Sequence, residues 1–331
     1  MESLLIKNED ELLVFYVEDI EIKTNIPNLF KDIFLFFSPF FKVDRTTFYA
    51  RESISAILIK NDDFNRIQSS LLGSEQVNLI YGGKKDEHHY FFESYKCNIN
   101  GYMGYFFPES SVYMINDDLG KKRIIADNQK NIFCFLRRLL RSEYLYPSYI
   151  ERGYIPLHAA CVVKKNKALA FLGKSGAGKT SAILPLIEYF DYHLLAADLV
   201  FLSNEGIVVG TPEKMRISPI TLKQYSPKYD YLIHSSEKLS FSPSFFSLAF
   251  QCNLVKEAKL DAIILPQISI GTTKNDIRKI NQIYLEEYVS PFFFKSIDSN
   301  HVEWKKDIFQ LQYNGNVKKL IELYIENEVV I

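Results

Sequence analysis

A glycine-rich stretch in the middle of the chain has the residue types that bind phosphate groups. Its residues are Gly173, Lys174, Ser175, Gly176, Ala177, Gly178, Lys179 and Thr180, and Ser181 follows them. They match the pattern G-x-x-x-x-G-K-[ST], in which glycines let the backbone turn tightly and present N–H groups to phosphate oxygens. We expect Lys179 to reach the β- and γ-phosphates of a bound nucleotide and the Thr180 hydroxyl to ligate Mg²⁺.

The elements around this loop also fit phosphate binding. An apolar strand at 168–172 precedes the loop, and an amphipathic helix follows it and extends to 190. A helix N-terminus adds a favourable partial charge to an anion site. Pro185 lies within this helix and predicts a local kink that does not touch the loop. The competing interpretation is a strand-to-helix turn with an incidental Lys-Thr pair.

The loop alone does not name a reaction. Loops of this type occur in GTPases, transporter ATPases, helicases and small-molecule kinases. The chain has no N-K-x-D signature for guanine and no L-S-G-G-Q signature of a transporter ATPase. The residues around the loop must therefore decide between these classes.

The pattern along the chain predicts two domains, divided between residues 128 and 129. Residues 1–128 have short strands rich in β-branched and aromatic residues and one helix near 61–72, which predicts a small β-rich or α+β domain. An amphipathic helix at 129–145, ended by Pro147, leads into the second domain, 129–331. The second domain alternates strands with helices, so we expect an α/β fold.

The expected elements can be given as residue ranges. In the first domain the strands are 12–17, 55–59, 77–82, 88–99 and 111–115. In the second domain the strands are 157–163, 168–173, 193–203, 206–212 and 261–268, and a C-terminal helix covers 316–329. No internal repeat interrupts this order.

The composition is that of an ordinary globular protein and argues against several partners. The 331 residues are 47% apolar and 24% charged, and the net charge of −1 gives no electrostatic case for nucleic acid or an anionic membrane. Basic clusters at 121–123, 137–141 and 164–167 are interpreted as solvated faces or turns. No apolar stretch reaches the length of about 18 residues that predicts a membrane span.

The cysteines predict a reducing compartment. Cys97, Cys134, Cys161 and Cys252 are scattered in mostly apolar settings and form no C-x-x-C pair, so we expect free thiols and no zinc site. The first residues lack the basic start and continuous apolar stretch of a signal peptide. We therefore expect a cytoplasmic protein.

Four segments in a fixed order resemble a known family. They are GYIPLHAACVV (153–163), KALAFLGKSGAGKTSAIL (167–184), HLLAADLVFL (193–202) and GTPEKMRISP (210–219). They resemble the HPr kinase/phosphorylase catalytic domain, and within it the kinase-related branch that includes lasso-peptide kinases. This family shares its fold with ATP-dependent phosphoenolpyruvate carboxykinase. The resemblance covers residues from about 130 to 270.

The resemblance implies roles for single residues. His158 matches a family histidine near the transferred phosphate, and Asp198 matches the second of two adjacent aspartates that bind Mg²⁺ and activate the acceptor. Arg216 matches an arginine beside the phosphates, where it would offset developing charge. Lys238 matches, less closely, a family lysine and is a candidate for contacting the substrate. For three of them a plainer alternative stays open, namely a core histidine for His158 and a surface cation for Arg216 and Lys238.

The chain departs from the family at Ala197, where the first of the two aspartates is usual. That aspartate is the candidate general base toward the acceptor hydroxyl, and a missing base costs about 10²–10⁴ in rate. Three interpretations stay open. Asp198 serves both metal and base, or His158 or an acid such as Glu213 substitutes, or the protein binds nucleotide and catalyses little.

The resemblance implies an ATP- and Mg²⁺-dependent kinase that phosphorylates a hydroxyl group, in the first instance Ser or Thr of a peptide or small protein. A small-molecule kinase would need the same site, and a nucleotide-dependent regulatory module is the competing class. A carboxykinase-like lyase would need further metal and oxyacid ligands that the sequence does not show. The N-terminal domain is a candidate for acceptor recognition, and a homo-oligomer stays open.

Overall fold

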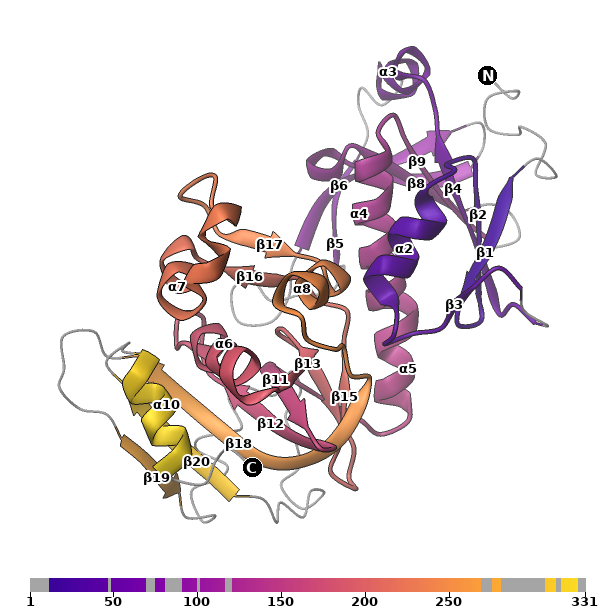
Figure 1. The fold of residues 1–331 in the computed structure, drawn as a ribbon. Coiled ribbons are helices and arrows are strands. Elements are labelled where there is room, and N and C mark those ends of the chain that lie inside the picture. Colours follow the sequence, from indigo (N-terminus) through magenta and orange to yellow (C-terminus); the bar gives the residue numbers. More distant parts are fainter. Residues whose placement is uncertain are drawn as a thin grey trace. The chain divides into compact units, whose positions relative to one another are not determined.

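The computed structural model describes residues 12–46, 49–69, 75–80, 91–99, 102–116, 121–268, 276–280, 307–313 and 317–326. The chain forms two compact units, Met1–Ser148 and Tyr149–Ile331, which Figure 1 distinguishes by colour along the sequence. Both units combine sheets with helices, so the fold is mixed α/β.

The first unit is built on one mixed sheet. Its strands are β1 (Leu13–Val17), β2 (Ile20–Thr24), β3 (Val43–Asp44), β4 (Glu52–Leu58), β5 (Gln76–Ile80), β6 (Phe91–Ile99), β7 (Tyr102–Phe107), β8 (Val112–Asn116) and β9 (Lys122–Ala126). Within the described residues they lie in the order β3-β1-β2-β4-β9-β8-β7-β6-β5, and β4 is parallel to both β2 and β9. The predicted strands at 12–17, 55–59, 77–82, 88–99 and 111–115 correspond to β1, β4, β5, β6 and β8.

Helices of the first unit supply its apolar core. They are α2 (Leu29–Phe37), α3 (Asn61–Ser69), the 3₁₀ turn η2 (Pro108–Ser110) and α4 (Gln129–Leu139). Helix α2, which the sequence pattern did not predict, buries Leu29, Ile33, Phe36 and Phe37. Asn128 caps α4 by accepting a hydrogen bond from the Lys130 N–H, a common way to begin a helix.

The helix that follows β9 is longer than the sequence predicted. From α4 it continues through a π-helical turn, η3 (Leu140–Leu145), into α5 (Tyr146–Glu151). The prediction that Pro147 ends this helix is wrong, because Pro147 lies in the first turn of α5, where a missing N–H is tolerated. Helix α4 packs on β4 and β9 of the first unit. The structure therefore divides the units at Ser148 and Tyr149, later than the predicted boundary.

The second unit has a central sheet of both parallel and antiparallel pairs. Its strands are β10 (Ile155–Leu157), β11 (Ala159–Lys164), β12 (Lys167–Leu172), β13 (His193–Ala196), β14 (Val200–Leu202), β15 (Ile207–Gly210), β18 (Glu257–Ile268), β19 (Asp276–Ile280) and β20 (Asp307–Tyr313). Among the described residues the main path is β10-β14-β15-β18-β12-β11-β13, and β20 pairs with both β18 and β19. Strands β16 (Met215–Ile217) and β17 (Leu239–Phe241) form a separate ribbon.

Two apolar clusters lie on opposite faces of this sheet, because side chains alternate along a strand. Ala160 and Val162 of β11 face one cluster, and Ala159 and Cys161 face the other. The first cluster includes residues of α6 (Lys179–Phe190), α7 (Pro219–Tyr225), α8 (Pro243–Phe250) and α10 (Val317–Glu326). The described part of the unit also contains the 3₁₀ segment η4 (Pro227–Leu232). Helix α10 confirms the predicted C-terminal helix, and its Tyr324 hydroxyl donates to the Ala182 carbonyl at 2.9 Å.

Two predicted strands are interrupted in the structure. The expected strand at 157–163 breaks at His158, between β10 and β11, and the expected strand at 193–203 breaks at Ala197–Leu199, between β13 and β14. Both breaks occur because the chain changes its pairing partner there: β10 pairs with β14, whereas β11 pairs with β13.

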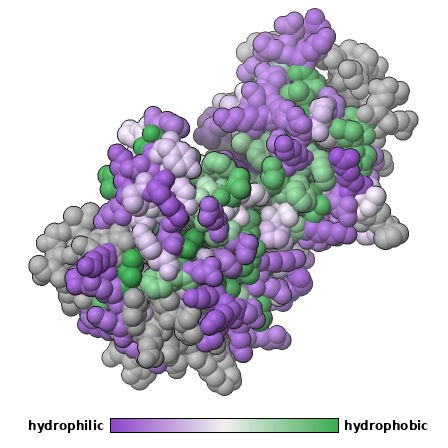
Figure 2. All heavy atoms as spheres, in the orientation of Figure 1, coloured by the Kyte–Doolittle hydropathy of each residue, from purple (hydrophilic) through white to green (hydrophobic). Residues whose placement is uncertain are grey.

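The surface and the cysteines give no sign of a membrane span or a disulfide in the described part of the chain. The helices there are all too short or too polar to cross a bilayer. Hydrophilic residues dominate the face of the second unit drawn in Figure 2, with scattered hydrophobic ones between them. All four cysteines are free, as predicted, and burial raises the pKa of Cys97 and Cys252 to about 11.

Candidate nucleotide-binding site

The sheet of the second unit brings the predicted site residues to one edge. Strand β11 is antiparallel to both of its neighbours, with Ala159 opposite Leu172 of β12 and Cys161 opposite Ala196 of β13. The beginning of β11 therefore lies beside the ends of β12 and β13. His158 precedes β11, the glycine-rich loop follows β12, and Asp198 follows β13. Segments separated in the sequence thus converge at one place.

The loop has the strand–loop–helix form that the sequence predicted. Gly176 and Gly178 have φ values of +85° and +101°, a region that L side chains rarely adopt. A Cβ atom added at Gly173 would approach the Ala177 Cβ to 2.7 Å, so only glycine fits there. Helix α6 begins at Lys179, directly after Gly178. The loop thus has glycine at positions where its backbone needs one. This is the condition under which the backbone of such a loop can approach a phosphate group closely.

Lys174 and Ser175 are exposed, whereas Thr180 is half-buried at the start of α6 and Ser181 is buried. The Ala177 N–H donates to the Lys174 carbonyl at 3.1 Å, and the Ala177 carbonyl accepts from the Ile268 N–H at 3.3 Å. The second contact attaches the loop to the end of β18. The loop is therefore held by the sheet as well as by its own turn.

Lys179 is the buried cation of this site. Its ammonium donates to the Gly173 carbonyl at 2.6 Å and lies 3.3 Å from His158 Nε2. Burial lowers the pKa of Lys179, and the nearby Asp198 carboxylate partly opposes this. A poorly hydrated ammonium that is held by one carbonyl is well placed to exchange that carbonyl for a phosphate oxygen.

His158 and Asp198 form a short polar contact at this edge, with 2.7 Å between Nε2 and Oδ1. Because the pKa of Asp198 is lowered, we assign a carboxylate to Asp198 and a hydrogen to Nε2, which donates to it. The same nitrogen then has no lone pair for Lys179, whose ammonium bonds to Gly173 instead. The three side chains therefore form an ordered row from carboxylate to imidazole to ammonium.

The pKa of Asp198 is lowered by its neighbours. Desolvation by the surrounding protein would raise it, but the hydrogen bond from His158 and the charge of that residue outweigh the desolvation. The positive charges of Lys179 and Arg216 lower it further. The side chain is nevertheless 63% exposed, so the carboxylate stays accessible to a metal ion or an acceptor.

Arg216 and Lys238 lie on the two-stranded ribbon of the second unit. Arg216 of β16 stands opposite Ser240 of β17, so the two side chains share one face. Lys238 immediately precedes β17 and lies two residues before Ser240, so its side chain projects from the same face. Arg216, Lys238 and Ser240 are all exposed. The structure thus brings Arg216 within electrostatic range of Asp198, and the roles of Lys238 and Glu213 stay predictions.

Ala197 faces away from the polar side chains of the site. It is 8% exposed and packs in the apolar cluster that includes Ala160, Val162 and Leu194. The position where the family has its first aspartate is thus part of the core in this chain. A carboxylate there would have to be buried among apolar side chains.

We expect Ala197→Asp to lower the free energy of unfolding by about 1–3 kcal/mol at neutral pH, the usual cost of a buried polar group without partners. The sequence alone suggested that this change could restore a general base. Burial would raise the pKa of the new carboxyl, so the part of the penalty that comes from its charge should be lost as the pH falls below that pKa, while the cost of the neutral carboxyl stays. Denaturant unfolding of Ala197→Asp beside Ala197→Asn, at neutral and acidic pH, measures this. A large gain in turnover without loss of stability would contradict it.

Thr211 is a site-supporting residue that the sequence analysis missed. It is 1% exposed, and its hydroxyl donates to the Leu199 carbonyl at 2.5 Å. Leu199 directly follows Asp198, so this bond joins the segment that precedes Arg216 to the segment that carries the carboxylate. A threonine at the end of a strand gives no pattern by itself, and only the pairing of Val200 with Gly210 reveals its partner.

The described residues contain no group of three or more His, Cys, Asp or Glu side chains that could hold a metal ion by themselves. Asp198 and Thr180 are the oxygen donors that the sequence predicted for Mg²⁺. Magnesium is commonly held by one or two protein oxygens together with substrate phosphates and water. The residues present fit that arrangement.

Comparisons with known proteins find a likeness to solved structures. No family model and no curated protein matches the chain. Among solved structures, the chain is similar to the Hpr(Ser) kinase/phosphatase from Coxiella burnetii, with 12% sequence identity and a TM-score of 0.30. The match covers 53% of this chain and 96% of that one. The functional proposal below rests on the geometry of the site and not on this likeness.

Proposed function

We propose that the protein is an ATP- and Mg²⁺-dependent kinase that transfers the γ-phosphoryl group to a hydroxyl acceptor. The observation that carries the proposal is the convergence of Lys179, His158 and Asp198 at the end of a complete phosphate-binding loop. Phosphoryl transfer depends mainly on positioning and on charge stabilisation. This edge of the sheet offers the cations, the backbone amides and the carboxylate for both.

The chain's own residues divide the tasks. The loop amides and Lys179 hold the β- and γ-phosphates, and Thr180 and Asp198 hold Mg²⁺, which would neutralise phosphate charge when bound. Asp198 also accepts the proton of the acceptor hydroxyl. His158 orients the Asp198 carboxylate through the 2.7 Å contact. Arg216 offsets negative charge from the ribbon side.

The acceptor that we propose is a Ser or Thr hydroxyl of a peptide or small protein. This step is supported by the resemblance of the four motif segments to the HPr kinase-like family. A small-molecule alcohol would use the same catalytic residues, so the acceptor class is an outcome of the experiment below. The proposed role of Lys238 is to contact that acceptor from the exposed face it shares with Arg216.

A second candidate function is a nucleotide-dependent regulatory module with little turnover. The observation in its favour is that Ala197 is buried in the core. This segment therefore supplies one carboxylate, whereas the family that it resembles usually has two. In such a module the row of Asp198, His158 and Lys179 would report nucleotide binding without transferring phosphate.

Transfer of label from γ-labelled ATP separates these functions. Purified protein with Mg²⁺ is incubated with labelled ATP, with and without lysate of the source cells, and products are sorted into proteins, peptides and small molecules. We expect label to move to a peptide or protein. Label in a small molecule would support a kinase whose acceptor is a small-molecule alcohol instead of a peptide or protein. Label that stays on ATP, while ATP binding is measurable, would favour the regulatory module.

A further inference from the structure

A row of lysines crosses the sheet of the second unit at the edge opposite the glycine-rich loop. Lys164 of β11 stands opposite Lys167 of β12, and Lys167 stands opposite Lys259 of β18. Residues that are paired in register project from the same face of a sheet. The three ammonium groups therefore leave the same face on three adjacent strands.

Such a row is unfavourable without a negative partner. Neighbouring strands are about 4.8 Å apart, and like charges directly opposite each other destabilise a sheet. The Asp261 carboxylate sits at the irregularity in the β12–β18 pairing and is 3.7 Å from the Lys167 ammonium, so it offsets one of these charges. Glu257 precedes Lys259 by two residues on β18 and supplies a second carboxylate on that strand. With Lys165 of the adjoining turn, the cations still outnumber these carboxylates, although the whole chain has a net charge of −1.

The turn between β11 and β12 adds a fourth cation in an unfavourable backbone conformation. Lys165 and Asn166 have φ values of +49° and +63°, as in the two-residue hairpin turns that favour Asn, Asp and Gly. Asn166 fits this preference, whereas Lys165 does not. A lysine at this position therefore costs conformational energy and adds charge to the cluster.

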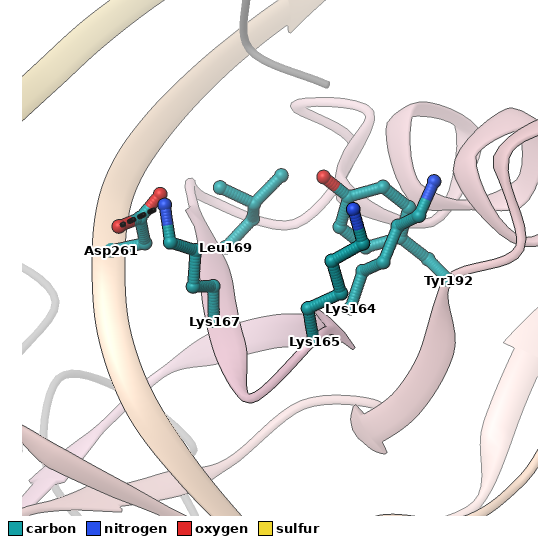
Figure 3. Close-up of a pocket in the computed structure, with 6 residues that line it drawn as sticks. All are labelled: Lys164, Lys165, Lys167, Leu169, Tyr192 and Asp261. Atoms are coloured by element: carbon teal, nitrogen blue, oxygen red, sulfur yellow. Dashed lines mark ion pairs between the residues drawn. The ribbon is translucent and has the colours of Figure 1, made fainter. Parts of the chain in front are cut away.

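The cluster surrounds a shallow pocket, and we name it the lysine pocket. Its lining residues are Lys164, Lys165, Lys167, Leu169, Tyr192 and Asp261. Figure 3 shows the lysine side chains rising from the hairpin on the same side as the Tyr192 ring, with the Lys167–Asp261 ion pair at the other end. The Lys164 ammonium is 5.7 Å from the centre of that ring. The buried ring and Leu169 exclude water from one wall, which strengthens attraction between opposite charges.

The C-terminal end of α6 offers a partial explanation for the lysines. Asp191 caps that end and Tyr192 follows it, and a helix C-terminus carries about half a negative charge. This charge is much smaller than that of the lysines. It does not account for three cations in register or for Lys165 in the turn.

We propose that the lysine pocket binds a small multivalent oxyanion, namely a phosphate group. This binding site is distinct from the glycine-rich loop. The lysines that line the pocket come from one hairpin and lie beside a small hollow, which suits a small anion better than a macromolecule. Bound phosphate would relieve the repulsion between Lys164, Lys165 and Lys167, which line the pocket. The pocket includes Tyr192, just beyond the end of α6 that is far from Lys179.

Calorimetric titration with inorganic pyrophosphate tests the proposal. The proteins are the wild type, Lys165→Asn, Lys167→Gln, and Lys223→Gln as a control in the exposed part of α7. Each is also made with Lys179→Ala, which weakens binding at the loop. We expect the Lys179→Ala protein to keep a pyrophosphate site. Lys165→Asn and Lys167→Gln should each weaken that site about tenfold, the loss of one charge-assisted hydrogen bond, and Lys223→Gln should not.

Lys165→Asn separates lost binding from lost folding. Asparagine suits the turn, so without anion this variant should melt at a higher temperature than the wild type. Titration with inorganic phosphate and with glucose 6-phosphate distinguishes a free ion from a phosphorylated small molecule, and either result supports the site. Pyrophosphate binding that is unchanged in both lysine-pocket variants, or that vanishes entirely with Lys179→Ala, would overturn the proposal.

Discussion

Asp198→Asn is expected to reduce turnover by about 10²–10⁴-fold, the usual contribution of a general base. The amide keeps the shape of the carboxylate, and its oxygen can still accept the hydrogen bond from His158. The variant therefore removes the negative charge and the proton acceptor while leaving the row of side chains in place. Steady-state rates with labelled ATP and the identified acceptor give the effect on kcat and on KM separately.

Two further measurements decide how Asp198 acts. In the wild type its lowered pKa implies a contribution to stability that is present above the unfolded-state pKa of about 3.9 and is lost as the pH falls through the folded pKa. The stability difference from Asp198→Asn should therefore disappear in acid. Glu213→Gln serves as the matched control at the other candidate acid. If Glu213→Gln loses turnover and Asp198→Asn does not, the base is Glu213.

The backbone form of the glycine-rich loop was predictable because its requirements are local. Gly176 and Gly178 adopt backbone angles that glycine favours, and Lys179 begins a helix directly after an apolar strand. These features depend on residues within about one turn of each other, so the sequence pattern contains them. The same holds for α4, whose apolar spacing and Asn128 cap are adjacent in the chain.

Features that depend on pairing between distant segments were not predictable. The breaks at His158 and at Ala197–Leu199 arise where the chain passes from one strand partner to another, and no turn residue marks them. Helix α2 was missed because Phe and Leu suit a buried helix as well as a buried strand. Pro147 was misread because its effect depends on the π-helical turn before it.

The candidate site has the same division between local and distant requirements. The identity of each polar side chain is visible in the sequence, but the direction of Ala197 into the core and the bond from Thr211 to Leu199 are set by the sheet register. The lysine pocket is a further case. A run of Lys164, Lys165 and Lys167 reads as a solvated turn, and only the pairing with β18 adds Lys259 to the row.

Lys179→Met is expected to reduce turnover by about 10²–10³-fold, as the loss of one preorganised donor to a transferring group does. Methionine keeps most of the apolar stem and removes the ammonium, which lies 2.6 Å from the Gly173 carbonyl. Because Lys179 is largely buried, solvent cannot supply an equivalent charge to the phosphates. The rate of γ-phosphoryl transfer at saturating ATP measures the loss.

Lys174→Met is the matched control, since Lys174 belongs to the same loop but is exposed. We expect it to keep turnover within about threefold of the wild type, as is usual for a surface change of about 0.5 kcal/mol. Thermal melting of both variants shows whether they fold. Equal losses in the two variants would mean that general positive charge on the loop is what matters. A folded Lys179→Met protein with wild-type turnover would remove Lys179 from the proposed mechanism, although its ammonium contacts both the loop and His158.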